Sequence, residues 1–104
     1  MTPLSYHEAA EEELLREIGY LELRNKGLGK RFFAEIRRAE KIISKYPESA
    51  EEIRPGIRKQ VLRKFRYSII YSTASEGVLV LAMLTTVGPT GVTARSDSLA
   101  RSIV

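Results

Sequence analysis

The sequence predicts an α+β fold, in which an N-terminal helical hairpin packs on a small, mainly antiparallel β-sheet. Apolar residues recur every three or four positions in two stretches between residues 8 and 46, which is the period of amphipathic helices. Residues 56–71 are rich in β-branched and aromatic side chains, and residues 78–84 form an apolar run of strand length. Helical patterns followed by strand patterns favour a helical layer packed on one face of a sheet.

The first helix is expected to begin near Ser5. A short strand at Thr2 to Tyr6 precedes it, and Ser5 with Glu8 has the spacing of a capping box. Asn25 and Gly27 are typical of a helix end. The buried stripe of this helix is predicted to be Ala10, Leu14, Ile18 and Leu21.

The second helix is expected to run from Leu28 to the stop at Pro47. Because only a few residues separate the two helices, we expect them to pack antiparallel. Its predicted apolar stripe is Leu28, Phe32, Ile36, Ala39, Ile43 and Tyr46.

Residues 56–71 form a basic stretch that we interpret as two strands meeting near Phe65 to Tyr67. No acidic residue lies between Ile53 and Ser75, so the cations have no partner nearby in the sequence. They are therefore candidates for contacts with an anionic ligand or a macromolecular target. The alternative, that they solvate the sheet or pair with helix glutamates, stays open. The candidates are Arg58, Lys59, Arg63, Lys64, Arg66 and Tyr67.

The remaining segments are turns, one strand and a tail. Ser49 to Arg54 is expected to be a polar connector, and Pro55-Gly56 is a turn signal. After a second turn at 74–77, Val78 to Leu84 is predicted to be a central strand buried on both faces. Residues 1–84 would then form the domain, and residues 85–104 a poorly ordered tail.

Composition limits the classes of function. A chain of 104 residues is one domain, and the absence of Cys excludes thiolate metal sites and fits a reducing compartment such as the cytoplasm. No apolar run is long enough to span a membrane, and the sequence predicts neither a metal site nor a cofactor. Eleven of the 13 acidic residues precede Ile53, so we expect an acidic helical side and a basic sheet side.

The order of these elements resembles the RelE/ParE superfamily, the toxins of bacterial type II toxin–antitoxin modules that include plasmid stabilisation proteins. The resemblance covers about Leu4 to Met83. It implies a cytoplasmic bacterial growth inhibitor that is neutralised by a cognate antitoxin encoded beside it. The matching segments are residues 6–14, residues 32–47, Gly56-Ile57-Arg58 and residues 65–71.

The C-terminal tail departs from the family pattern. Relatives usually continue after the last strand with a His- and Arg-rich run, whereas this chain has Met83-Leu84-Thr85-Thr86. Shifting the codons of residues 82–94 by one base permits His-Ala-His-His-Arg-Arg-Pro-Asp-Trp-Gly-Asn-Arg, a string of the family type. Our hypothesis is a frameshift near Ala82, which the coding DNA would refute if its wobble bases do not spell that string.

The resemblance implies two possible mechanisms. ParE-type members bind DNA gyrase and trap it on cleaved DNA, whereas RelE-type members cut messenger RNA in the ribosome. The chain lacks the C-terminal catalytic residues of the ribonucleases and its only histidine is His7, which favours the ParE type and leaves enzymatic activity undecided. A non-enzymatic nucleic-acid-binding module and an inactive toxin remnant are the remaining alternatives.

Overall fold

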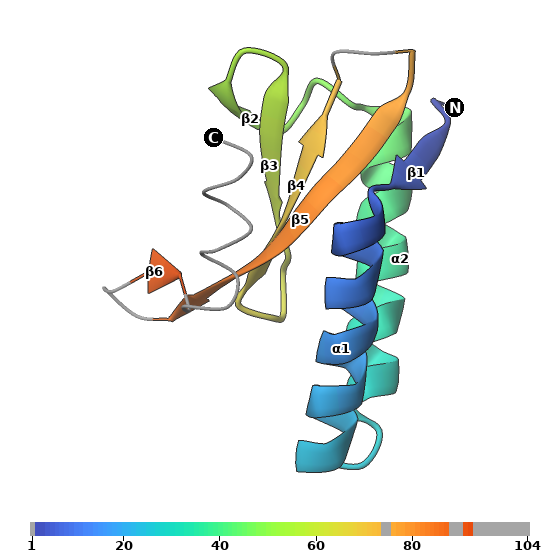
Figure 1. Cartoon of the computed structure of the whole chain (residues 1–104), viewed down its shortest axis with the longest axis vertical. Helices are drawn as coiled ribbons and strands as arrows, with labels where there is room; N and C mark the ends of the chain where they lie inside the picture. The colour runs from blue at the N-terminus through green and yellow to red at the C-terminus, as the bar shows by residue number, and fades with distance from the viewer. Residues whose placement is uncertain (1, 74–75, 88–90, 93–104) are drawn as a thin grey trace.

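The computed structural model describes residues 2–73, 76–87 and 91–92. Two antiparallel helices lie side by side on one face of a mixed sheet (Figure 1), so the predicted fold class is confirmed. The helices are α1 (Glu8–Arg24) and α2 (Leu28–Lys45). The sheet has the order β1 (Leu4–Tyr6), β5 (Val78–Val87), β4 (Tyr67–Ser72), β3 (Ile57–Val61) and β2 (Glu51–Arg54), and β6 (Gly91–Val92) pairs with the end of β5.

The N-terminal strand corrects the predicted start of the first helix. Ser5 lies in β1 and pairs in parallel with Leu79 of β5, so it cannot form the predicted capping box. The N-cap is instead His7, whose Nδ1 accepts a hydrogen bond from the Ala9 N–H at 3.1 Å. Pairing with β5 fixes the backbone through Tyr6 in extended form, and the helix therefore begins at Glu8.

The helical hairpin is held by a close approach of its two helices. A Cβ at Gly29 would lie 2.5 Å from the carbonyl oxygen of Ile18, so only glycine fits there. Glu22 accepts hydrogen bonds from the N–H groups of Gly27 and Gly29 at 2.9 and 3.0 Å. Gly27 itself has φ 88, in the left-handed region that glycine favours. The expected end of the first helix near residues 25–27 is confirmed.

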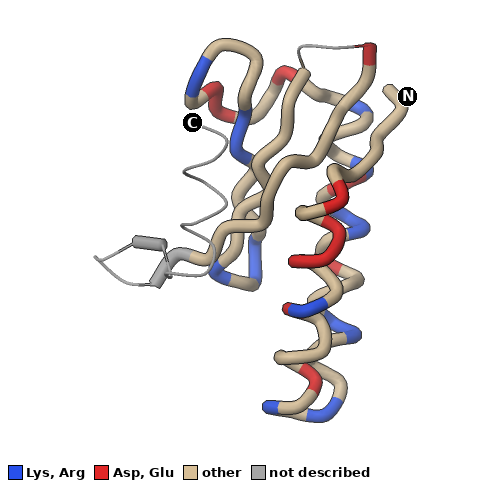
Figure 2. The backbone as a smooth tube through the Cα atoms, viewed as in Figure 1, with Lys and Arg blue, Asp and Glu red and all other residues tan. Residues whose placement is uncertain are grey.

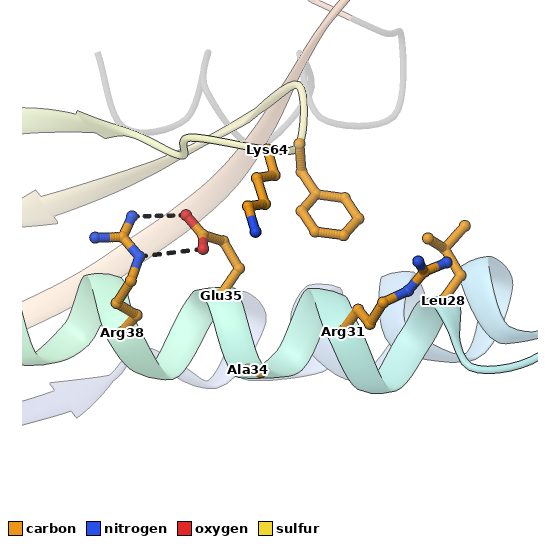
Figure 3. A pocket seen from close by; sticks show the side chains of 7 residues that line it. Leu28, Arg31, Ala34, Glu35, Arg38 and Lys64 are labelled. Atoms are coloured by element: carbon orange, nitrogen blue, oxygen red, sulfur yellow. Dashed lines mark hydrogen bonds and ion pairs between the residues drawn. The ribbon is translucent and has the colours of Figure 1, made fainter.

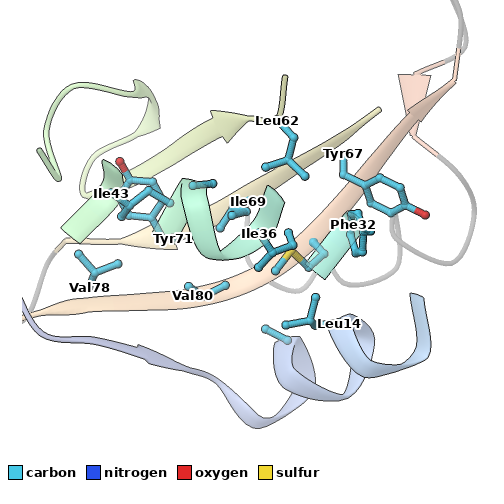
Figure 4. Packing of buried hydrophobic residues seen from close by; sticks show 13 residues of the cluster. Leu14, Phe32, Ile36, Ile43, Leu62, Tyr67, Ile69, Tyr71, Val78 and Val80 are labelled. Atoms are coloured by element: carbon cyan, nitrogen blue, oxygen red, sulfur yellow. The ribbon is translucent and has the colours of Figure 1, made fainter. Parts of the chain in front are cut away.

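The core lies between the helices and the inner face of the sheet (Figure 4). Phe32 and Tyr67 lie at one end of the cluster, and Ile43 and Tyr71 lie at the other. The predicted stripes supply its helical half, with two corrections. Leu28 is only partly buried and lies outside the cluster. Tyr46 is 56% exposed, because the helix ends at Lys45 and Tyr46 becomes its C-cap.

The expected polar connector contains a strand. Residues 51–54 form β2, which pairs antiparallel with β3 across the Pro55-Gly56 turn. All four of its residues are exposed, so no hydrophobic pattern marks it in the sequence. A short, charged strand is typical of a protected sheet edge, and backbone pairing with β3 together with the Lys59–Glu51 ion pair holds it here.

The basic stretch forms two antiparallel strands, as predicted, but three of its cations lie between them. Arg63, Lys64 and Arg66 belong to the β3–β4 connection, residues 62–66, and do not project from a strand. The chain leaves β3 because Leu62 turns into the core and Phe65 packs edge-on against Phe32, with centroids 5.2 Å apart. This connection therefore presents its charged residues beside α2.

The last long strand extends further than expected. β5 continues to Val87, and its burial alternates at first: Val78 and Val80 are buried while Leu79 and Leu81 are partly buried. The expected burial on both faces holds at the adjacent residues Ala82 and Met83, which are both fully buried, and only in part along the rest of the strand. Most of the tail predicted at residues 85–104 lies outside the described residues, apart from the end of β5 and β6.

Acidic and basic residues are divided between the two helices of the hairpin, and not between the helices and the sheet. α1 carries six acidic and two basic residues, whereas α2 carries six basic and two acidic ones. Figure 2 shows acidic positions concentrated on α1 and basic positions on α2 and the β3–β4 connection. The expectation of an acidic helical side is therefore wrong for α2, whose cations add to those of the connection.

Candidate basic groove

A pocket of about 540 Å³ lies between α2 and the β3–β4 connection. In Figure 3, Lys64 descends from the connection towards the helix, while Arg31 and Arg38 lie along the helix itself. We call this site the basic groove, because it has three cationic side chains and one carboxylate. Its lining residues are Leu28, Arg31, Ala34, Glu35, Arg38, Lys64 and Phe65.

Glu35 and Arg38 form the rigid wall of the basic groove. Arg38 donates two hydrogen bonds to Glu35, from Nε at 3.1 Å and from Nη2 at 2.6 Å, and the Arg63 N–H donates a third at 3.0 Å. Glu35 is 8% exposed. The hydrogen bonds from Arg38, aided by that from Arg63, lower the pKa of Glu35. Glu35 therefore stays ionised and fixes the connection against α2.

Arg31 and Lys64 are the cations left for a ligand. Among the described residues, neither side chain has a hydrogen-bond or ion-pair partner, and both are exposed. Apolar atoms of Leu28, Ala34 and Phe65 lie in the same lining. The groove can therefore accept a partner that offers both negative charge and apolar surface.

Arg58 lies at a different place in the sheet. Its Nη1 donates to the carbonyl oxygens of Glu48 and Ala50, at 3.0 and 2.7 Å. Tyr71, opposite Arg58 in β4, donates to the Pro47 carbonyl at 2.8 Å. Arg58 thus ties the segment after α2 to the sheet, and the structure does not bring it to the basic groove.

Lys59 and Tyr67 are also separate from the basic groove. Lys59 pairs with Glu51 of β2, with Nζ and Oε1 3.7 Å apart. Tyr67 is 8% exposed, and its hydroxyl donates to Oε1 of Glu17 at 2.6 Å. Burial raises the pKa of Tyr67, with smaller contributions from Tyr20 and Glu13. Of the six predicted candidates, Lys64 lines the groove, while Arg63 and Arg66 lie beside it in the connection.

Sequence reasoning missed the helical half of the basic groove. Arg31, Glu35 and Arg38 are spaced by four and three residues, so they form one line on α2 beside the apolar stripe. That line of charged residues could have been recognised in the sequence. The contact between this line and residues 62–66, however, is a tertiary contact, which no local sequence pattern indicates.

We expect acid to weaken the fold partly through Glu35. Because its pKa is lower in the folded chain, its stabilisation is complete above the unfolded value of about 4.3 and is lost as pH falls through the folded pKa. Glu35→Gln should cost about 1–3 kcal/mol at neutral pH and should flatten the loss of stability on acidification. Urea unfolding at neutral and acid pH measures both effects. The control Glu48→Gln changes an exposed carboxylate outside the groove, and equal acid slopes for the two variants would contradict this role.

Within residues 2–73, 76–87 and 91–92, no group of three His, Cys, Asp or Glu side chains is arranged to hold a metal ion. None of the described helices has the length and apolar content of a membrane span.

Comparison with known proteins identifies the fold. No protein-family model matches the sequence, and no curated protein does. A chain of the solved structure "Chromosomal ParDE TA system from P. aeruginosa" superposes with a TM-score of 0.64 at 18% identity. The match covers 80% of this chain and 94% of that one. The protein therefore has the fold of a chain from a ParDE toxin–antitoxin system.

Proposed function

We propose that the protein is the toxin of a type II toxin–antitoxin pair, a cytoplasmic bacterial protein that inhibits growth and stabilises a plasmid. The observation that carries the proposal is the fold match, which extends over nearly the whole of a chain from a ParDE system. The RelE/ParE-like segments of the sequence support it independently of the superposition. A cognate antitoxin is the first partner that this function requires.

The basic groove is the proposed contact surface. Arg31 and Lys64, whose side chains have no partner in the described part of the chain, supply positive charge, while Leu28, Ala34 and Phe65 supply apolar atoms. An antitoxin segment with acidic and apolar side chains would cover both. Arg63 and Arg66 extend the positive surface along the connection, where the toxin would meet its target.

We propose DNA gyrase as that target. The described lining of the groove contains neither His nor Tyr, and its one carboxylate, Glu35, is held by hydrogen bonds from Arg38 and the Arg63 N–H. His7 caps α1, and the Tyr67 hydroxyl is held by Glu17. These placements favour a binding toxin of the ParE type over a ribosome-dependent nuclease of the RelE type.

The target is tested with purified full-length protein. We expect the chain that carries the frame-restored tail to make gyrase accumulate cleaved DNA and to leave ribosome-bound messenger RNA intact, and the variants below are made in the same chain. Arg31→Glu with Lys64→Glu should abolish trapping, because it reverses both free cations of the groove. The control, Lys30→Glu with Lys41→Glu, makes the same change in net charge at exposed positions of α2 outside the groove lining, and should trap normally.

Three results of this experiment would redirect the proposal. Cleavage of messenger RNA in ribosomes, without trapped DNA, would assign the RelE-type activity. Binding to bare RNA or DNA that weakens steeply with salt, with no effect on gyrase, would favour the nucleic-acid-binding module. Equal trapping by the groove variant and its control would remove the basic groove from the contact surface.

A further inference from the structure

The outer face of α1 has an exposed apolar stripe centred on a glycine. Leu15 is 63% exposed and Leu23 is 90% exposed, and Gly19 lies midway between them. At 3.6 residues per turn, these residues lie within about 60° of Gly19 around the helix axis, opposite the buried face. The face consists of Glu12, Leu15, Arg16, Gly19, Glu22 and Leu23.

Nothing within the described chain explains why residue 19 is glycine. A Cβ built at Gly19 meets no heavy atom within 4 Å, in contrast to Gly29, where it would collide with α1. Glycine is the poorest helix former after proline, and Gly19 lies in the middle of a 17-residue helix. A glycine on an exposed helix face is suited to the close approach of another backbone.

The side chains that precede Gly19 are complementary, in charge and apolar character, to those that follow it. Residues at equal distances before and after Gly19 form the pairs Leu15 with Leu23, Arg16 with Glu22, and Glu12 with Lys26. A two-fold axis through Gly19 brings the first two of these pairs together across two antiparallel helices, and each pair occurs twice. Lys26 follows the C-cap Asn25, so it would meet the partner's Glu12 from the turn after α1 and not from the helix face. A parallel arrangement would instead place Glu12 against Glu12 and Glu22 against Glu22. The pattern therefore indicates that the binding partner is a second copy of this chain and that its helix runs antiparallel to α1.

We propose that a second copy of this chain binds the outer face of α1, with the two helices antiparallel and crossing at Gly19. Figure 1 shows that the far half of the hairpin extends beyond the sheet, so a second hairpin can reach α1 there. The basic groove lies on the other helix, between α2 and the β3–β4 connection, and is separate from this interface. The dimer is independent of the function proposed above. One helix pair makes a small interface, so the dimer forms reversibly with concentration.

The other contacts of the paired charges are compatible with this dimer. Arg16 donates to Glu13 through Nη1 at 2.9 Å, and its side chain is still half exposed. Glu22 is exposed, and hydrogen bonds from Gly27 and then Gly29 and Lys30 lower its pKa, so it carries the negative charge that the partner's arginine would meet. Glu12 and Lys26 are exposed and have no side-chain partner among the described residues.

A charge swap tests the register directly. Sedimentation equilibrium of the full chain should show a monomer–dimer equilibrium over a wide range of concentration. Glu12→Lys or Lys26→Glu alone should raise the dissociation constant about tenfold, because each replaces two attractive pairs by two repulsive ones. The combination of both substitutions should restore the wild-type value, and Lys41→Glu on α2 is the matched control. A monomer at every soluble concentration, or a dimer that neither single swap weakens, would overturn the proposal.

Gly19→Ala distinguishes an effect on the dimer interface from an effect on the stability of the monomer. In the monomer the added methyl meets open space and removes a helix-breaking residue, so the midpoint of thermal unfolding at low concentration should rise. In the dimer the same methyl lies at the crossing point, so the dissociation constant should rise as well. A variant that is more stable and dimerises as well as the wild type would contradict the crossing at Gly19.

Discussion

Phe32→Ala is expected to lower the free energy of unfolding by about 3–5 kcal/mol, the range for removing a large aromatic side chain from a core. Phe32 is fully buried. Its ring centroid lies 5.2 Å from that of Phe65 and 4.7 Å from that of Tyr67, so its loss removes two aromatic contacts as well as apolar burial. Small domains are stable by about 5–15 kcal/mol, and the variant would therefore lose a large share of its stability. Urea and thermal unfolding measure the change.

The neighbouring residue provides the control for Phe32. Phe33 is 39% exposed and lies under the guanidinium of Arg37, 5.2 Å from its ring centroid. Phe33→Ala should cost about 1 kcal/mol or less, as is usual at surface positions. An equal loss of stability in both variants would contradict the assignment of Phe32 to the core. Because Phe32 contacts Phe65, its removal should also loosen the connection that carries Lys64.

The parts of the fold that local patterns determine were predictable. Ile36 and Ile43 repeat with the helical period, and Pro55-Gly56 marks a turn, because these features act through neighbouring residues. β2 was missed because its residues, Glu51 to Arg54, are all exposed, and pairing with β3 rather than a hydrophobic pattern makes them a strand. The capping box at Ser5 failed for a similar reason, since pairing with β5 determines the conformation there.

The candidate site was predictable only in part. Uncompensated cations in residues 56–71 drew attention to Lys64, which lines the groove. Sequence could not show that Arg58 would bind two backbone carbonyls, or that Lys59 would meet Glu51 across a strand pair. Nor could it show that Glu13 and Glu17, both 1% exposed, would lie on the buried side of α1. Such partners come from chain segments that meet only after folding.

The frame-restored tail is expected to have the largest effect on activity. We propose that residues after Ala82 replace a His- and Arg-rich segment through a frameshift, and that this segment completes the surface of the toxin. Restoring His-Ala-His-His-Arg-Arg-Pro-Asp-Trp-Gly-Asn-Arg should therefore convert a weak or silent chain into one that arrests growth. The basic groove precedes the altered residues, so Arg31→Glu with Lys64→Glu should suppress that arrest.

Bacterial growth after tightly controlled induction tests the toxin assignment most directly. The cells would express either the present chain or the frame-restored chain at matched soluble levels. The account predicts arrest by the restored chain and relief of that arrest by Arg31→Glu with Lys64→Glu. Arrest by the present chain as well would place the active surface before Leu84, within the described fold. Normal growth with both chains, each folded and soluble, would contradict the assignment of this protein as a toxin.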